Sequence, residues 1–415
     1  MKNVWRTGII FTAAQFLTLA IGFGFQMTVR RELGDRTGEF GFFQTLVIFI
    51  GFLGLPVAIA AQAVTHYIAR FHLASDSERL HGLLAGCRKF LFHITIGGSI
   101  AAIIFIKPLG DFLHIPRLSL MIIALVCTLA GLWSSYITAL CQGLGWFKRL
   151  AGIVLLAAIV RFAFGVPMTA FNRVAESAVS ASAVMLLAYL ALLYWKKDLP
   201  HTTDQAISPW TREFVQFLVV SAACVFGAAC FSQYDALVAQ RYFSKGELDD
   251  YTSAGLLARQ IPSLVGPLLT VLFTHRSGRH HGEALVEQLK LFGLYALGLM
   301  VNAGGLYLLK GLGLRLIGQN TPEAAAMIGP FCVTMIFAGL IQAFGTWALA
   351  SRWIKISLLY GVLGLVYLAV LLVFGTSPDR LLHVMPFATG IAFTILFVVW
   401  LVAMRLHKIG APEET

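Results

Sequence analysis

The chain has 415 residues, of which 58% are apolar and only 12% are charged, whereas a soluble domain carries about 25% charged residues. This composition excludes an ordinary soluble fold and requires the lipid bilayer as the solvent for most of the chain. The net charge of +11 does not indicate nucleic-acid binding, because Lys and Arg residues sit singly or in pairs between apolar runs and form no basic patch.

A spanning helix needs about 20 predominantly apolar residues. The first run is too long for the apolar core of a signal peptide, so we expect it to remain as the first helix. The sequence therefore predicts an all-α integral membrane protein with about twelve transmembrane helices. The predicted spans lie near residues 7–29, 41–69, 90–108, 118–141, 150–172, 175–195, 214–239, 251–275, 288–309, 324–350, 353–375 and 384–404.

The longest connection follows the sixth run and contains Pro200 and Pro209, so it is typical of a hinge between two halves. We predict an N-terminal six-helix lobe (1–196), a cytoplasmic inter-lobe loop (197–213), a C-terminal six-helix lobe (214–405) and a cytoplasmic tail (406–415). Lys and Arg are more frequent in the segments on the side of the N-terminus. The positive-inside rule then places both termini in the cytoplasm.

The second half carries signs of an internal repeat. Arg30, Phe40 and Pro56 recur as Arg241, Tyr251 and Pro267, each 211 residues further along the chain. Each set spans a helix end, a short charged loop and a proline midway along the next helix. Transporter folds often contain such repeats.

Ionisable residues within spans are costly and usually face a partner or a water-filled cavity. Arg259, eight residues into the eighth run, is a candidate cavity cation for a phosphate, or it snorkels or pairs with Asp235. Asp235 itself is a candidate for a coupling Na⁺ or H⁺, or for an ion pair with Arg259 or Arg241. Arg161 has no acidic neighbour in sequence and is a second candidate phosphate ligand, unless local thinning of the bilayer accommodates it.

Several absences in the sequence argue against enzymatic and metal chemistry. The six cysteines show no CxxC or Cys/His cluster, which predicts neither a disulfide framework nor a metal site. No nucleotide-binding or hydrolase motif occurs in a supporting context, and the outer loops are short. We therefore predict no enzyme activity and no cofactor. The acidic residues of these loops are interpreted as solvated linkers: Glu32, Asp35, Glu39, Glu247, Asp249 and Asp250.

Two stretches carry a family resemblance. They are RRELGDRTGEFGFFQTLVIF after the first helix and QYDALVAQRYFSKGELDDYTSAGLLARQIPSLVGPLLTVLFTHRS in the second half. With HYIAR in the second helix and ALCQGLGWFKRLA after the fourth, they resemble the polysaccharide-transporter (Wzx-like flippase) branch of the multidrug/oligosaccharidyl-lipid/polysaccharide (MOP) exporter superfamily.

The resemblance implies two lobes around a central cavity that opens alternately to each face. It also implies transport of an undecaprenyl-diphosphate-linked oligosaccharide across the bacterial cytoplasmic membrane for O-antigen or exopolysaccharide synthesis. Asp235, Tyr251 and Arg259 match the second-lobe pattern, and Arg31, Gly34 and Phe40 match the first. Arg259, Arg161 and Arg31 are therefore the candidate diphosphate ligands. The expected partners are the lipid-linked oligosaccharide, membrane lipids, a coupling Na⁺ or H⁺, and glycosyltransferases and a polymerase of the same pathway, with no nucleic acid.

One departure concerns the lipid II flippases of the superfamily. They carry an Arg-Asp pair where this sequence has Gly24 and Phe25, and they have two more helices than the twelve predicted here. The alternatives are a multidrug or cation antiporter of the same fold and a membrane-embedded polysaccharide polymerase or ligase. An antiporter is expected to use lumen carboxylates, and Asp235 is the one acidic residue clearly within a predicted span.

Overall fold

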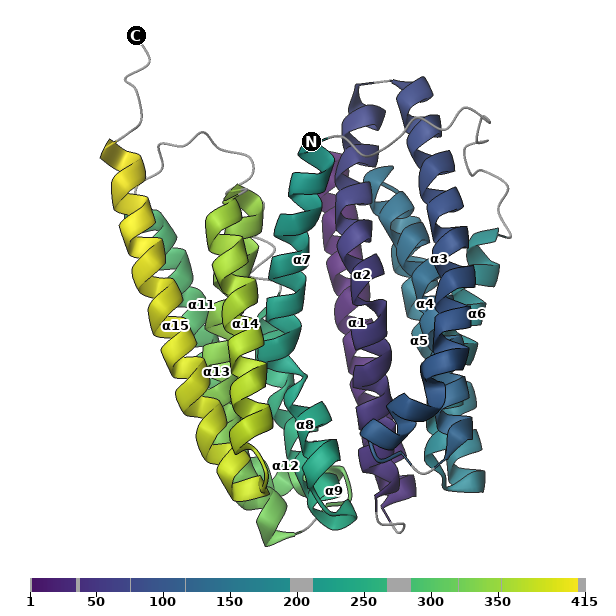
Figure 1. Cartoon of the computed structure of the whole chain (residues 1–415), viewed down its shortest axis with the longest axis vertical. Coiled ribbons are helices and arrows are strands. Elements are labelled where there is room, and N and C mark those ends of the chain that lie inside the picture. The colour runs from purple at the N-terminus through teal and green to yellow at the C-terminus, as the bar shows by residue number, and fades with distance from the viewer. Residues whose placement is uncertain are drawn as a thin grey trace. The chain divides into compact units, whose positions relative to one another are not determined.

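The computed structural model describes residues 2–34, 38–74, 76–115, 117–194, 212–266, 285–319, 321–351 and 353–409, and within these ranges every regular element is an α-helix. Figure 1 shows these helices as long rods, with the short α8, α9 and α12 gathered at one end of the second half. The helices are α1 (Lys2–Leu33), α2 (Glu39–Leu73), α3 (Ser77–Phe112), α4 (Leu118–Gly143), α5 (Phe147–Asn172), α6 (Ala175–Tyr194), α7 (Arg212–Ser232), α8 (Asp235–Tyr242), α9 (Lys245–Ala258), α11 (Leu285–Leu308), α12 (Lys310–Leu316), α13 (Pro322–Ser351), α14 (Ile354–Phe374) and α15 (Pro378–Ile409).

The twelve predicted runs lie on helices wherever the structure describes them, and three of them are bent, the third by 57° within α3. The seventh run forms α7 and α8, which meet at a bend of 48°, and the ninth continues through a bend of 72° into α12. In the described part of the chain, six helices are long and apolar enough to cross a membrane, or up to nine if each bent pair is one span. Hydropathy cannot predict bends of this kind, because it reports the length of an apolar run and not whether the helix is straight.

The chain divides into two compact units, Met1–Leu218 and Val219–Thr415. Unit 1 contains α1 to α6, and unit 2 contains most of α7 and the helices that follow it. The predicted inter-lobe loop, 197–213, lies almost wholly outside the described residues, as do the tail beyond 409 and the Pro267 of the repeat.

The helices of the two units pack in corresponding pairs. In unit 1, α2 and α6 both contact α4, and α5 contacts α6; in unit 2, α9 and α15 both contact α13, and α14 contacts α15. In each half, therefore, the second and the sixth helix both pack against the fourth. This recurrence supports the internal repeat that the 211-residue offset indicates.

Small residues allow α14 to approach α7 closely. A Cβ added at Gly364 would lie 2.9 Å from the Cα of Gly227, and one at Gly361 would lie 3.1 Å from the Cα of Ala223. In lipid, helices gain no hydrophobic free energy by associating, so close backbone packing at such residues becomes a main source of stability. This contact holds α7, the first helix of unit 2, against α14. The candidate functional site described below lies at the end of α7.

Candidate functional site

Asp235 and Arg259 form a buried ion pair in unit 2. Nη2 of Arg259 lies 2.6 Å from Oδ2 of Asp235, and the two side chains are 14% and 1% exposed, respectively. The Tyr251 hydroxyl donates a hydrogen bond of 2.5 Å to the same carboxylate oxygen. The ion pair, one of the two interpretations of Asp235 from sequence, is therefore present in the structure.

The break between α7 and α8 positions this pair. Asp235 lies in the first turn of α8, where the positive end of the helix dipole stabilises a carboxylate. Nε of Arg259 donates a hydrogen bond of 3.2 Å to the carbonyl oxygen of Ser232, the last residue of α7. That carbonyl has no partner within its own helix, because the last turn of a helix leaves its carbonyls unsatisfied. Arg259 thus joins the end of one helix to the start of the next.

Aromatic rings enclose the ion pair. The ring of Tyr251 lies 4.9 Å from that of Phe331 and 5.4 Å from that of Phe243, measured between centroids. The guanidinium of Arg259 lies 5.9 Å from the centroid of Phe331, at cation–π distance. Within the described structure, the second carboxylate oxygen of Asp235 has no hydrogen-bond partner. In such a weakly polar environment the attraction between the two charges is strong, and separating them is costly.

Arg161 lies in a different environment, in the middle of α5 in unit 1. Its guanidinium covers the face of Phe25 at 4.4 Å from the ring centroid. The Nε atom is buried without a hydrogen-bond partner, and among the described residues no carboxylate pairs with this side chain. A cation–π contact is weaker than an ion pair and leaves the charge in place. Arg161 therefore carries an uncompensated positive charge, whereas the charge of Arg259 is balanced by Asp235.

Arg31 is exposed at the end of α1. Its neighbour Arg30 is the buried one, at 3% exposure, with its guanidinium 5.2 Å from the centroid of Phe40. Arg161 lies beside Phe25, more than one turn earlier in α1. Unit 1 therefore does not bring Arg31 and Arg161 together at one point.

Three comparisons with known proteins bear on this arrangement. No family model matches the chain, and no curated protein matches it. Solved structures do. The lipid II flippase MurJ in an inward closed conformation superposes with a TM-score of 0.69 at 12% identity, covering 94% of this chain and 87% of that one. An inward-facing multidrug resistance MATE family transporter of the MOP superfamily gives 0.64 at 13% identity, with 95% and 99% covered.

A third similar structure is a MOP superfamily transporter from Pyrococcus furiosus, with a TM-score of 0.61 at 14% identity, covering 97% of this chain and 96% of that one. The chain has the MOP transporter fold. The predicted class is thereby confirmed: all-α, with about twelve transmembrane helices in two lobes. A chain with this fold and these apolar helices is a multi-pass membrane protein.

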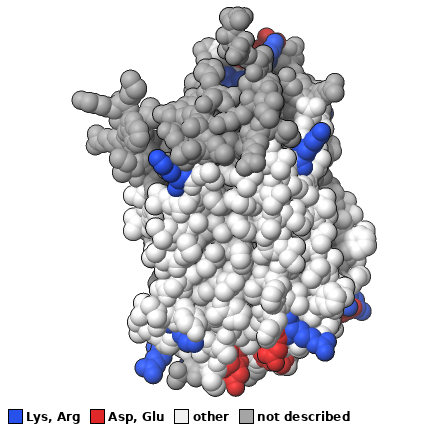
Figure 2. All heavy atoms as spheres, turned by 90° about the vertical axis from the view of Figure 1, so that its left-hand side faces the viewer, with Lys and Arg blue, Asp and Glu red and all other residues white. Residues whose placement is uncertain are grey.

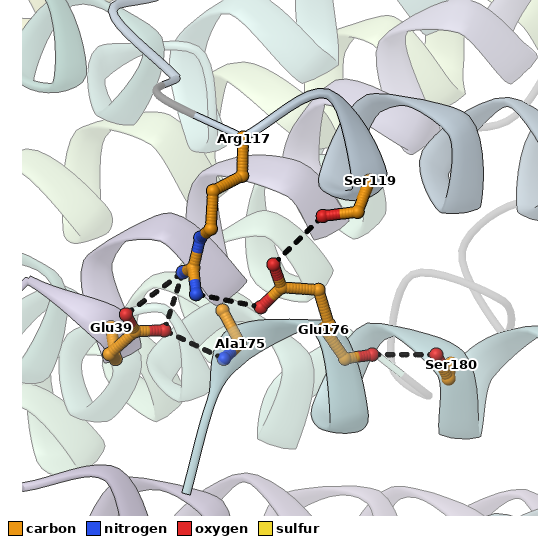
Figure 3. A network of polar contacts seen from close by, with 6 residues as sticks. All are labelled: Glu39, Arg117, Ser119, Ala175, Glu176 and Ser180. Atoms are coloured by element: carbon orange, nitrogen blue, oxygen red, sulfur yellow. Dashed lines mark hydrogen bonds and ion pairs between the residues drawn. The ribbon is translucent and has the colours of Figure 1, made fainter. Parts of the chain in front are cut away.

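Unit 1 of this MOP fold also contains a polar network that sequence analysis missed (Figure 3). Arg117, which precedes α4, contacts both oxygens of Glu39 at 2.9 and 2.7 Å and one oxygen of Glu176 at 3.0 Å. The backbone N–H of Ala175 donates to Glu39, and the Ser119 hydroxyl donates to Glu176. The interpretation of Glu39 as a solvated linker is therefore wrong, because this carboxylate joins the starts of α2, α4 and α6.

Unit 2 repeats this feature at the position 211 residues later. Asp250 accepts hydrogen bonds from Gln319 and, at 2.8 Å, from the hydroxyl of Thr321, which directly precedes α13. Asp249 is also buried, at 6% exposure, and Glu247 forms a capping box with Ser244 at the start of α9. The linker interpretation is wrong for Asp249 and Asp250 too, whereas Glu247 is exposed and caps the start of a helix. Their position in the first turns of a helix after a short loop was the available signal.

Proposed function

We propose that this protein is a flippase that moves an undecaprenyl-diphosphate-linked oligosaccharide across the bacterial cytoplasmic membrane by alternating access, for surface polysaccharide biosynthesis. The observation that supports this most is Arg161, a guanidinium in the middle of a spanning helix with no carboxylate paired to it among the described residues. Unpaired cations within a membrane are costly, and such residues commonly mark a path for anions.

A diphosphate needs such a group because burying its charge in hydrocarbon costs several kcal/mol or more. A guanidinium stays ionised and donates two parallel hydrogen bonds to phosphate oxygens. In this proposal Arg161 binds the diphosphate first, and Arg259 contributes only when a phosphate replaces Asp235 as its partner. Arg31, exposed at the end of α1, meets the substrate only outside the apolar part of the helices.

The second candidate is a multidrug or cation antiporter, which the similarity to MATE transporters favours. An antiporter of cations requires an ionised acidic group that can exchange one cation for another. In the described spans the buried acidic group is Asp235, and Arg259 already neutralises it. The same pairing argues against Asp235 as a coupling site for Na⁺ or H⁺ while Arg259 stays in place.

Reconstituted liposomes test the proposal, with translocation of a fluorescent undecaprenyl-diphosphate oligosaccharide as the readout. Arg161→Gln is expected to lower the transport rate roughly 10- to 100-fold, the loss that follows from removing charged hydrogen bonds. Arg161→Lys should recover only part of the rate, because a lysine lacks the planar fork. The matched control is Arg173→Gln, which removes an exposed arginine at the end of the same helix.

Transport that is equally fast in wild type and Arg161→Gln would contradict the role of Arg161. Export of a cationic dye without movement of any lipid-linked sugar would instead establish the antiporter. We further propose that both termini are cytoplasmic. Reporter domains fused to either end should then be active on the cytoplasmic side of the membrane.

A further inference from the structure

An apolar groove lies on the surface of unit 2 between α14 and α15. Its volume is about 400 Å³, and apart from Tyr367 and His383 every side chain lining it is aliphatic or phenylalanine. Ala388 and Ala392 lie one turn apart on α15, and their small side chains leave the space that forms the groove. The exposed Phe374 forms part of the rim of the groove. The groove is large enough for a ligand and belongs to neither arginine site.

The surroundings of the groove define what can fill it. Both helices are long and apolar enough to cross a membrane, so the medium at their outer surface is lipid hydrocarbon. Figure 2 views the side of the molecule where α15 lies in Figure 1 and shows a broad band free of Lys, Arg, Asp and Glu between charged residues near its ends. The visible part of this band contains no charged side chain, and the lining of the groove within it is almost wholly apolar. A hydrocarbon chain is therefore the chemistry that matches the groove.

The length of the groove matches one leaflet. It extends along α14 from Leu363 to Phe374, a rise of roughly 16 Å at about 1.5 Å per residue. The hydrocarbon of a single leaflet is about half of a core of roughly 30 Å. One acyl chain can thus lie along the groove from its polar end to the middle of the bilayer.

Apart from the buried Tyr367, the polar group of the lining lies at one end, at the start of α15. His383 lines the groove there, and its Nδ1 is hydrogen-bonded to the carbonyl of Asp379. Arg380 is exposed one turn earlier on the same face of the helix, because residues three apart are neighbours. A guanidinium at this depth suits the phosphate of a lipid head group.

We propose that the groove is a binding site for a glycerophospholipid, with one acyl chain between α14 and α15 and the phosphate at Arg380. The lipid is a resident and not the transported substrate. A layer formed by Tyr367 and Met385 separates the groove from the ion pair: both side chains are buried, and the sulfur of Met385 lies 3.3 Å from the hydroxyl oxygen of Tyr251. The proposal does not depend on the transport function.

Photo-crosslinking tests this site directly. The full-length protein is placed in nanodiscs with a phosphatidylglycerol that carries a diazirine on its acyl chain, and the adducts are located by mass spectrometry. We expect them to concentrate on residues 363–374 and 383–395. Ala388→Trp, which fills the groove, should lower that labelling about tenfold, and Arg380→Gln should lower it roughly fivefold, as the loss of one exposed charge contact does.

Val398→Trp is the matched control, since it adds the same ring at an exposed position of α15 outside the groove. The labelling of the two tryptophan variants is compared only if their thermal stabilities are equal. Arg380→Gln changes only an exposed side chain. Labelling spread evenly over α15, or unchanged in Ala388→Trp, would overturn the site. Displacement of the probe by a polyprenyl phosphate but not by phospholipid would overturn the proposed occupant.

Discussion

Phe25 of α1 packs against Gly165 of α5 so closely that a Cβ added at Gly165 would lie 2.5 Å from a ring carbon of Phe25. The same ring carries the guanidinium of Arg161, one turn earlier in α5, on its face. The position of Arg161 therefore depends on the absence of a side chain at residue 165.

Gly165→Ala is expected to destabilise unit 1 by about 1–3 kcal/mol, because the new methyl group overlaps both Phe25 and the Cβ of Ala181. The melting temperature in detergent measures this. Gly152→Ala, in the same helix with open space around its Cα, is the control and should be neutral or stabilising by up to about 1 kcal/mol. Equal effects of the two substitutions would show that α1 and α5 are not packed as described.

Loss of the Asp235–Arg259 ion pair is expected to lower the stability of the protein, whatever its effect on transport. Asp235→Leu and Arg259→Met should each destabilise the protein by about 3–5 kcal/mol, because each leaves a buried charge without its partner. The double variant should be more stable than either single one. A double-mutant cycle on thermal unfolding measures the coupling, and strictly additive effects would contradict a direct ion pair.

Tyr251→Phe isolates the hydroxyl that shares the Asp235 oxygen. The ring and its packing against Phe331 are kept, so the expected loss is about 1–3 kcal/mol, from one hydrogen bond to a charged group. The same substitution in Asp235→Leu should cost much less. Tyr307→Phe, on an exposed tyrosine of α11, serves as the control in the same thermal assay.

Arg117→Gln is expected to destabilise unit 1 by only about 1 kcal/mol, since the three charged side chains are partly exposed. The loss should shrink as salt is added, because ions screen exposed charges. Arg79→Gln, at an exposed pair with Asp76, gives the baseline for a surface ion pair. A loss that does not change between low and high salt would mean that Arg117 acts through packing and not through its charge.

Much of the fold follows from the sequence, because the length of an apolar run in lipid leaves few alternatives to a helix. The helices in the described parts of the apolar runs and the two-lobe fold class are readable in this way. The break after Ser232 was not predicted, since residues 214–239 were interpreted as one run although Ser232, Gln233 and Asp235 lie at the break. It depends on Arg259, 27 residues later, which satisfies the carbonyl that the break exposes.

The polar contacts at the helix starts show a different limit. Glu39 and Asp250 resemble solvated loop residues because their partners, Arg117 and Thr321, lie about 70 residues or more away in sequence. Charge and turn patterns report near neighbours, whereas these pairs form only after the second and fourth helices have packed. The difference between Arg161 and Arg259 arises in the same way, because only the packed structure shows which of them meets a carboxylate.

The bend between α7 and α8 has an evolutionary consequence. Ser232 contributes only its backbone carbonyl, so many residues can replace it, but Asp235 and Arg259 depend on each other's charge. Among homologues, the two positions should be lost or exchanged together. A lineage that keeps Arg259 after losing Asp235 would be one in which an anion from outside the chain has taken over the place of the carboxylate.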